Sequence, residues 1–306
     1  MIETPMDILK EFPVRKTRKQ KKLFRESIQS YAEKLGYQVT VEAGNSDSRN
    51  IVIGDPETAR YLITAHYDTA SGLWCPNWMV PTNPLMHVVC LLLNTVVLML
   101  PAFALGAVAA WFTRDPFLTH LILLVGVVCS ILLMAFGPAN RHNANSNTSG
   151  VVTLLETAVS MPRNLRRRVC FVLLDREERG MQGAVGYRKK HYFASKYQTV
   201  LDLSCVGDGE TILLVPSTAM RSDVNLLCLE RKCGDREVKV WKKKYFAWSS
   251  SHRLFPRSVA VAALHRGKLG YWLKGARTRR DTVLDYTNIN ILRACLISYI
   301  SSPAAE

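Results

Sequence analysis

Charged residues are missing from one long part of this sequence. No Asp, Glu, Lys or Arg lies between Thr69 and Thr113, and after the pair Arg114-Asp115 the next charged residue is Arg141. Helices of a soluble domain carry a polar stripe toward water, so they rarely lack charge over two successive stretches. The gap therefore argues against an ordinary soluble protein and predicts an integral membrane protein.

Residues 85–112 and 117–137 are the two predicted membrane spans. Each exceeds the ~20 residues with which an α-helix crosses the hydrocarbon core. Prolines mark their ends or a bend, at Pro84, Pro101 and Pro116. A pair of buried core helices is the alternative, but such helices are usually shorter and keep a polar face. Since few residues join the spans, we expect a transmembrane hairpin that returns the chain to its starting side.

Acidic residues are scarce relative to basic ones. Asp plus Glu number 25 against 40 Lys plus Arg, which gives a formal net charge of +15 and predicts an anionic partner. Basic clusters lie at 15–22, 163–168, 239–244 and 277–280. One is interleaved with aromatic residues in WKKKYFAW, which would suit single-stranded nucleic acid. No nucleic-acid module is recognisable, so we expect an anionic membrane surface or plain solvation, and no nucleic acid.

A secretory leader and a disulfide framework are both missing from the pattern. The N-terminal segment contains no apolar stretch of the kind that a signal peptide needs. The eight cysteines show no framework spacing, which agrees with a reducing compartment. We therefore expect two spans with the soluble domain on the cytoplasmic side.

Outside the apolar stretches, helix and strand patterns alternate. Apolar spacings of three and four predict a helix over 18–35, which Gly36 ends. Further helices are predicted at 151–161, from 182 and at 287–300, and strands at 37–41, 50–53, 61–65, 168–174, 199–203 and 212–215. This alternation predicts an α/β fold with one mixed sheet and helices on both faces. Residues 1–84 and 138–306 would form this single domain, and residues 85–137 an inserted two-helix hairpin.

Chemically active side chains accompany three of the predicted strands. His66 and Asp68 follow one strand in TAHYDT, Glu177 and Glu178 follow another in DREERG, and Asp202 lies in VLDLSCVGDG. Each has an ordinary structural explanation by itself, such as acidic residues at a helix N-terminus. Ligands bind at the carboxyl ends of strands in such sheets, so the three together predict a functional site.

Six segments in this order resemble metallopeptidase family 28, the co-catalytic di-zinc aminopeptidases. They are TAHYDT, NSNTSGVV, FVLLDREERGMQGA, VLDLSCVGDG, SSSHRLF and RTRRDTVLDYTNINIL. The resemblance extends from about Arg18 to the C-terminal helix, and the hairpin lies between the first two motifs, as in a membrane-embedded subgroup of the family. It implies an aminopeptidase-like α/β fold with a mixed, largely parallel sheet, zinc as cofactor, and a peptide or protein as substrate or ligand.

The resemblance also implies roles for five residues. His66 matches an imidazole ligand of the metal, and Asp68 matches the carboxylate that orients it. Glu178 and Asp202 match carboxylate ligands, one for each zinc ion. Glu177 matches the general base beside the bridging water. We therefore expect catalytic roles for Glu177 and Asp68, and metal binding by the other three.

Two positions depart from the family pattern. Ser146 stands where the family has its bridging Asp, and Arg277 stands where its last motif opens with a His ligand. Ser251 is a lesser departure, because the family often has Asp at that position. The next residue, His252, is a candidate residue on the substrate side. A guanidinium repels a metal ion and pairs well with a carboxylate. Arg277 should therefore exclude one zinc ion and bind the carboxylate of Glu178 instead.

The ligands that remain for the second ion are His66 and Asp202, fewer than the three of ordinary catalytic zinc sites. We expect at most one zinc ion, or none. Two function classes stay open. One is a membrane-anchored zinc aminopeptidase-like enzyme that uses Glu177 as base. The other is a pseudopeptidase, an inactive membrane protein that binds a peptide or partner. The retained carboxylates favour the first class, and the loss of bridge and imidazole favours the second, so that ordinary turnover is doubtful.

Overall fold

The central strands are apolar on both faces, as expected of a sheet that helices cover on both sides. In the computed structural model, which describes residues 2–302, the strands β3 (Tyr61–His66), β5 (Val169–Leu174) and β6 (Thr199–Leu203) are buried at every position. They pair in parallel in the order β5-β3-β6, and β10 (Ser258–Gly267) pairs in parallel with β6. The carboxyl ends of these strands therefore meet at one edge of the sheet.

The sheet becomes antiparallel on either side of this centre. Next to β5 lies β2 (Arg49–Ile53), and β1 (Val39–Ala43) forms that edge. Next to β10 lies β7 (Thr211–Pro216), which is antiparallel to it. The predicted fold class, a mixed sheet with a parallel centre, is confirmed.

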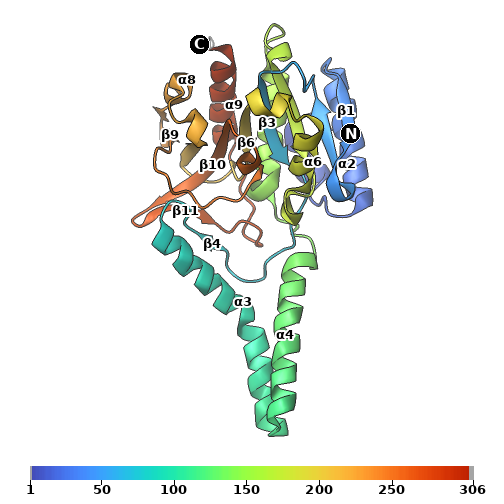
Figure 1. Cartoon of the computed structure of the whole chain (residues 1–306), viewed down its shortest axis with the longest axis vertical. Coiled ribbons are helices and arrows are strands. Elements are labelled where there is room, and N and C mark those ends of the chain that lie inside the picture. Colours follow the sequence, from blue (N-terminus) through green and yellow to red (C-terminus); the bar gives the residue numbers. More distant parts are fainter. Residues whose placement is uncertain (1, 303–306) are drawn as a thin grey trace.

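The far side of the sheet ends close to the inserted hairpin. Strand β9 (Arg236–Val240) pairs in parallel with β7, and β8 (Arg231–Cys233) forms the edge. The end of β10 turns back into β11 (Gly270–Lys274), which pairs with the short β4 (Trp78–Met79). Since β4 lies just before the first apolar helix, the β10–β11 turn lies beside the start of that helix (Figure 1).

Helices cover both faces of the sheet, as predicted. One face packs on α2 (Arg18–Lys34), α5 (Ser149–Ser160) and α9 (Tyr286–Ser301), and the other packs on α6 (Gln182–Lys190). A Cβ on Gly150 would lie 2.5 Å from the Leu203 carbonyl oxygen, so α5 can approach β6 only with glycine there. Three short helices complete the domain: α1 (Ile8–Glu11), α7 (Ala194–Tyr197) and α8 (Val224–Leu227).

The predicted spans form the helices α3 (Pro84–Thr113) and α4 (Pro116–Phe136), which project from the domain as a hairpin (Figure 1). Proline occupies the first position of each, where its missing N–H costs nothing. Pro101 lies inside α3, which is visibly bent. The buried residues of α3 along α4 include Ala102, Gly106 and Ala109, which allow a close approach.

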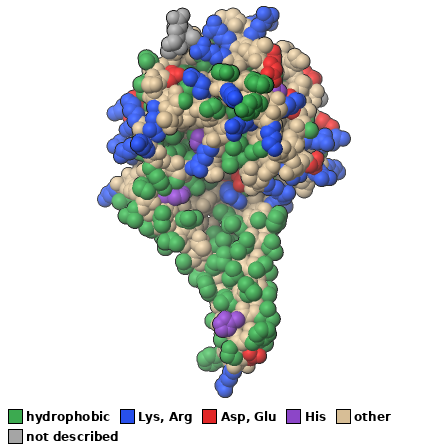
Figure 2. Space-filling model, in the orientation of Figure 1, with side chains coloured by type: hydrophobic (Ala, Val, Ile, Leu, Met, Phe, Trp, Pro, Cys, Tyr) green, Lys and Arg blue, Asp and Glu red, His purple; other side chains and the backbone are tan. Residues whose placement is uncertain are grey.

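The outer surface of the hairpin is apolar along most of its length (Figure 2). In the most apolar 18-residue stretch of α3, 17% of the residues are buried, and in that of α4, 0% are buried. A core helix of a soluble protein would be mostly buried. By length and composition, both helices could cross a membrane.

The predicted helices and strands are present, with ends shifted by up to two residues. The strands β4, β8, β9, β10 and β11 were not predicted. The run SVAVAAL in β10 is short, apolar and rich in alanine, and periodicity does not separate such a run from a buried helix.

Candidate functional site

Asp68 connects the ends of β3 and β5 at the carboxyl edge of the sheet. Its Oδ1 accepts a hydrogen bond from the Glu177 N–H at 3.1 Å, and its Oδ2 accepts one from the Glu178 N–H at 3.3 Å. The same Oδ1 lies 3.4 Å from Nδ1 of His66, which is also buried. Asp68 thereby holds three other predicted site residues: His66, Glu177 and Glu178.

The carboxylate of Glu177 is buried at this edge. Neither oxygen has a partner with normal hydrogen-bond geometry among the described residues. Burial, helped by the negative charges of Asp202 and Asp68 and opposed by His66, raises the pKa of Glu177 to about 8. The nearby Ser251 N–H also acts to lower the pKa of this carboxyl group. An uncompensated charge is costly in such surroundings, so burial favours the protonated form of this carboxyl group.

The pKa of His66 is also displaced. Burial disfavours its charged form, but the hydrogen bond and charge of Asp68, together with Glu178 and Glu177, outweigh burial and raise the pKa to about 9. The imidazolium would have to release a proton before either ring nitrogen could bind a metal ion.

Arg277 reaches the cleft from the loop that follows β11. Its Nη1 lies 3.4 Å from Oε2 of Glu178, so the ion pair expected from the sequence is present, through one guanidinium nitrogen. The backbone of Arg277 is in the left-handed region at φ 65°, and its N–H donates to Oδ2 of Asp281 at 3.2 Å.

Asp281 holds the loops of the two altered positions together. Besides Arg277, its carboxylate accepts hydrogen bonds from the N–H groups of Asn145 at 2.7 Å and Ser146 at 3.3 Å. Burial raises its pKa, and these hydrogen bonds act in the opposite direction. Sequence reasoning did not single out Asp281, although it lies within the quoted motif RTRRDT.

Asp202 lies within β6, and four donors occupy its carboxylate. Oδ1 accepts from the hydroxyls of Thr64 at 2.7 Å and Ser251 at 2.9 Å. Oδ2 accepts from the Ser250 hydroxyl at 2.5 Å and the His252 N–H at 3.2 Å. Two hydrogen bonds on each oxygen satisfy the usual capacity of a carboxylate. Ser250 and Thr64 were missed by the sequence analysis.

His252, the predicted substrate-side residue, lies beside Asp202 and donates its backbone N–H to that carboxylate. Its Nδ1 is 2.8 Å from the Ser250 hydroxyl oxygen. Burial lowers the pKa of His252, against the attraction of the Asp202 charge. The structure thus brings all eight sequence-predicted site residues to the region where β3, β5 and β6 end.

The cleft extends to the base of the hairpin. A cavity of about 230 Å³ is lined by Asp68, Glu178 and Arg277 together with Lys16 and, from α4, Met134. Within residues 2–302, no three His, Cys, Asp or Glu side chains are arranged so that they could hold a metal ion.

Comparison with known proteins identifies the fold. Residues 133–258 match the model of Peptidase family M28. The structure is similar to the LapA aminopeptidase of Legionella pneumophila, with a TM-score of 0.56, 13% identity, and coverage of 97% of this chain and 67% of that one. It is also similar to LapB of the same organism, with a TM-score of 0.57, 16% identity, and coverage of 97% and 69%.

The glutaminyl cyclase of Porphyromonas gingivalis is similar as well, with a TM-score of 0.53, 14% identity, and coverage of 97% of this chain and 96% of that one. At these identities the likeness shows the fold alone. No curated protein matches the chain in sequence. The resemblance to peptidase family M28 predicted from the motifs is confirmed, by sequence over residues 133–258 and by fold over nearly the whole chain.

Proposed function

We propose that this chain is a membrane-anchored pseudopeptidase: an M28-like domain that binds a peptide or protein partner in its cleft without hydrolysing it. The observation that carries the proposal is the state of Asp202 and Glu178, the two carboxylates at ligand positions. Asp202 is occupied by four hydrogen-bond donors, and Glu178 is paired with the guanidinium of Arg277.

Zinc, the cofactor that the family resemblance implies, does not fit these residues. A catalytic zinc ion takes three protein ligands with free lone pairs, as a rule. Binding through Asp202 would require it to lose hydroxyl donors, and binding through Glu178 would bring a dication beside Arg277. Ser146 offers only a neutral hydroxyl in place of the bridging carboxylate. His66 is then left without a second ligand among the family positions that the structure describes.

Anchoring in a membrane is the second part of the proposal. It is supported by the length and apolar surface of α3 and α4, whose exposed residues would otherwise form a very large apolar patch in water. The cleft opens beside Met134 and Ala135 at the end of α4. A partner of the cleft would therefore be bound close to the bilayer surface.

A hydrolytic enzyme that keeps Glu177 as base is the second candidate. It is favoured by the buried carboxyl group of Glu177, which lacks a partner with normal hydrogen-bond geometry in the described chain. Such a group is costly unless a water molecule or a ligand satisfies it, so its retention would be explained by catalysis.

Zinc content and peptidase activity separate the two candidates. The full chain, purified in detergent without chelator, should contain far less than one zinc ion per molecule and should not hydrolyse aminoacyl peptides. Stoichiometric zinc, together with turnover that Glu177→Gln abolishes, would establish the second candidate instead.

A repaired site gives the complementary test. Ser146→Asp with Arg277→His restores a bridging carboxylate and an imidazole and releases Glu178 from its ion pair. With these ligands added, zinc should compete with the hydroxyl donors of Asp202, and the double variant should bind about two zinc ions when the metal is supplied. Either single variant should bind less, because residues that act as a unit are non-additive. If the double variant binds no more zinc than the natural chain, these two residues do not occupy ligand positions.

A further inference from the structure

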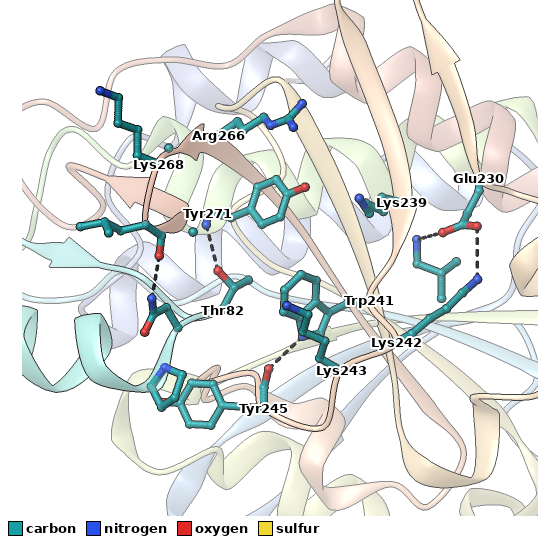
Figure 3. A pocket seen from close by; sticks show the side chains of 16 residues that line it. Thr82, Glu230, Lys239, Trp241, Lys242, Lys243, Tyr245, Arg266, Lys268 and Tyr271 are labelled. Atoms are coloured by element: carbon teal, nitrogen blue, oxygen red, sulfur yellow. Dashed lines mark hydrogen bonds and ion pairs between the residues drawn. The ribbon is translucent and has the colours of Figure 1, made fainter.

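A second cavity lies outside the cleft, at the start of α3. It has a volume of about 810 Å³ and is lined by the end of β9, the β10–β11 turn and residues 82–84, where α3 begins (Figure 3). This volume is in the range of small-ligand sites. Neither the predicted site residues nor the cleft contribute to it.

Hydrogen bonds fix the cavity to the helix. The Asn83 side-chain amide donates to the Leu269 carbonyl at 2.9 Å, and the Tyr271 N–H donates to the Thr82 hydroxyl at 2.8 Å. Gly270 between them has φ +132°, and a Cβ there would lie 2.7 Å from the Thr82 hydroxyl oxygen. The turn therefore keeps a constant position relative to the first turn of α3.

The lining is strongly basic. Arg266 and Lys268 come from the β10–β11 turn, and Lys239 and Lys243 come from β9 and the segment after it. Glu230 is the acidic residue of the lining, and it is already used: Oε1 accepts from the Val240 N–H at 3.0 Å, and Oε2 lies 3.7 Å from Nζ of Lys242.

The side chains of the other cations have no acidic partner within residues 2–302. Lys239, Lys243, Arg266 and Lys268 form no side-chain ion pair with any described residue. Figure 3 shows Arg266, Lys239 and Lys243 around Tyr271 and Trp241. Four uncompensated positive charges around one cavity repel each other, so an anion would stabilise this arrangement.

Aromatic and apolar groups complete the rim. Trp241 and Tyr271 meet edge to face with centroids 6.0 Å apart, and Lys243 lies 5.6 Å from the centroid of Trp241. Leu269 at the tip of the turn and Leu85 in the first turn of α3 are exposed. Aromatic rings beside cations, with exposed leucines next to them, are typical of the boundary between membrane and water.

We propose that this cavity binds the phosphate-bearing headgroup of an anionic phospholipid. The inference rests on the proposed membrane anchoring, because α3 then brings the cavity to the level of the headgroups. A soluble phosphate compound has the same chemistry, but the position beside the first turn of α3 favours lipid. Single-stranded nucleic acid is disfavoured because the cations surround one cavity instead of following a groove.

The test uses the full chain in a neutral detergent and measures lipid binding by native mass spectrometry. Phosphatidylglycerol should bind at least tenfold more tightly than phosphatidylcholine with the same acyl chains. Arg266→Gln with Lys268→Gln should weaken phosphatidylglycerol binding by roughly 10- to 30-fold. Each basic residue near an anionic surface contributes about equally to the binding free energy, and this variant removes two of them. Binding of phosphatidylcholine should not change.

Two further variants make the result specific. Arg188→Gln with Lys189→Gln removes the same charge from exposed positions on α6 and should leave both affinities unchanged. Arg266→Lys with Lys268→Arg keeps the charge and should retain the preference. Equal binding of the two lipids by the natural chain, or equal loss in both Gln variants, would overturn the proposal.

Competition experiments identify the source of the phosphate. Millimolar glycerol 3-phosphate and a single-stranded oligonucleotide should each leave lipid binding intact. Displacement of the lipid by either one would assign the cavity to that ligand and refute the lipid headgroup. Anchoring is judged separately: extraction of the chain from membranes by alkaline carbonate would refute anchoring, whereas an anchored chain without lipid preference refutes only the headgroup site.

Discussion

Arg15 is a fully buried cation whose hydrogen-bond partners in the described chain are uncharged. Its guanidinium donates to the carbonyls of Tyr67 and Phe12, both at 2.7 Å, and to Asn147 Oδ1 and Thr148 Oγ1, both at 2.9 Å. Burial lowers its pKa to about 10, but the group keeps its charge at neutral pH. Arg15 thereby joins the end of β3 to the segment that begins α5, the two elements that carry His66 and Ser146.

The carboxylates of the cleft follow the same pattern. Asp202, Asp281 and Asp68 each accept hydrogen bonds from hydroxyl or backbone N–H groups. Clustered carboxylates do not require a metal ion when enough donors surround them. Retention of acidic residues is therefore compatible with a binding cleft as well as with a catalytic one.

His265 in β10 lies between two carboxylates. Its Nε2 lies 3.2 Å from Asp208 Oδ1, and its Nδ1 lies 3.0 Å from Glu210 Oε2. The hydrogen bond with Asp208 is the largest cause that raises the pKa of His265, and partial burial opposes it. A raised pKa means that the protonated form stabilises the fold. The contribution is complete below about pH 6.5, the unfolded value, and is lost as the pH rises through the higher folded value.

We therefore expect His265→Gln to lower stability by about 0.5–1 kcal/mol at pH 5.5 and by much less at pH 9, as measured by thermal unfolding in detergent. Replacing the partners, with Asp208→Asn and Glu210→Gln, should remove this pH dependence. His142→Gln, at an exposed position, is the matched control. A cost of His265→Gln that is the same at both pH values would contradict the assignment.

At the scale of elements, the hairpin depends on small residues between its helices. A Cβ on Gly126 of α4 would lie 3.0 Å from Cβ and 3.1 Å from Cα of Ala102 in α3. Helices in lipid gain little from the hydrophobic effect, so close packing of this kind carries their association. Because α3 is bent near Pro101, its C-terminal half packs along α4 while its N-terminal half lies under the domain (Figure 1).

Gly126→Leu should force the helices apart, with a loss of about 1–3 kcal/mol, since overpacking requires backbone shifts. A lower midpoint of thermal unfolding in detergent would be the measurement. Val125→Leu adds one methylene at an exposed neighbouring position and should have little effect. If both variants unfold at the temperature of the natural chain, α3 and α4 do not pack as described.

At the scale of the whole molecule, the sheet determines how the chain can be placed in a membrane. Strand β3 precedes the hairpin, and its two neighbours β5 and β6 follow it. Strands that share hydrogen bonds must lie on the same side of a bilayer. On the proposed anchoring, a hairpin that crosses the bilayer must therefore enter and leave on that side, which would place the Arg114-Asp115 turn on the opposite one.

Short tags with a protease site test this placement in sealed vesicles. Tags inserted at Ser46-Asp47, before the hairpin, and at Gly234-Asp235, after it, should be cleaved from the same side. A tag between Arg114 and Asp115 should be cleaved only from the other side. Ser46-Asp47 lies in a short 3₁₀ helix and Gly234-Asp235 in a turn, and both pairs of residues are exposed, so insertion should be tolerated. Cleavage of the first two tags from opposite sides would exclude the hairpin topology.

Patterns within the chain predict the hairpin, a mixed sheet and the strand ends near His66, Glu177 and Asp202, and the motif resemblance adds the parallel centre of the sheet. These features depend on local properties, namely the length of an apolar stretch, the spacing of apolar residues and motifs of a few residues. The residues Ser146 and Arg277 were recognised as departures because each lies within such a motif.

The groups that surround those residues depend on contacts between distant segments of the fold. Asp202 takes its donors from Thr64 and from Ser250 and Ser251, which lie far away in the sequence. Asp281 links the loops of both altered positions, and the basic cavity joins β9, the β10–β11 turn and the start of α3. Hydrogen bonds and cavities arise where distant segments meet, and no local pattern in the chain records which donor reaches which acceptor.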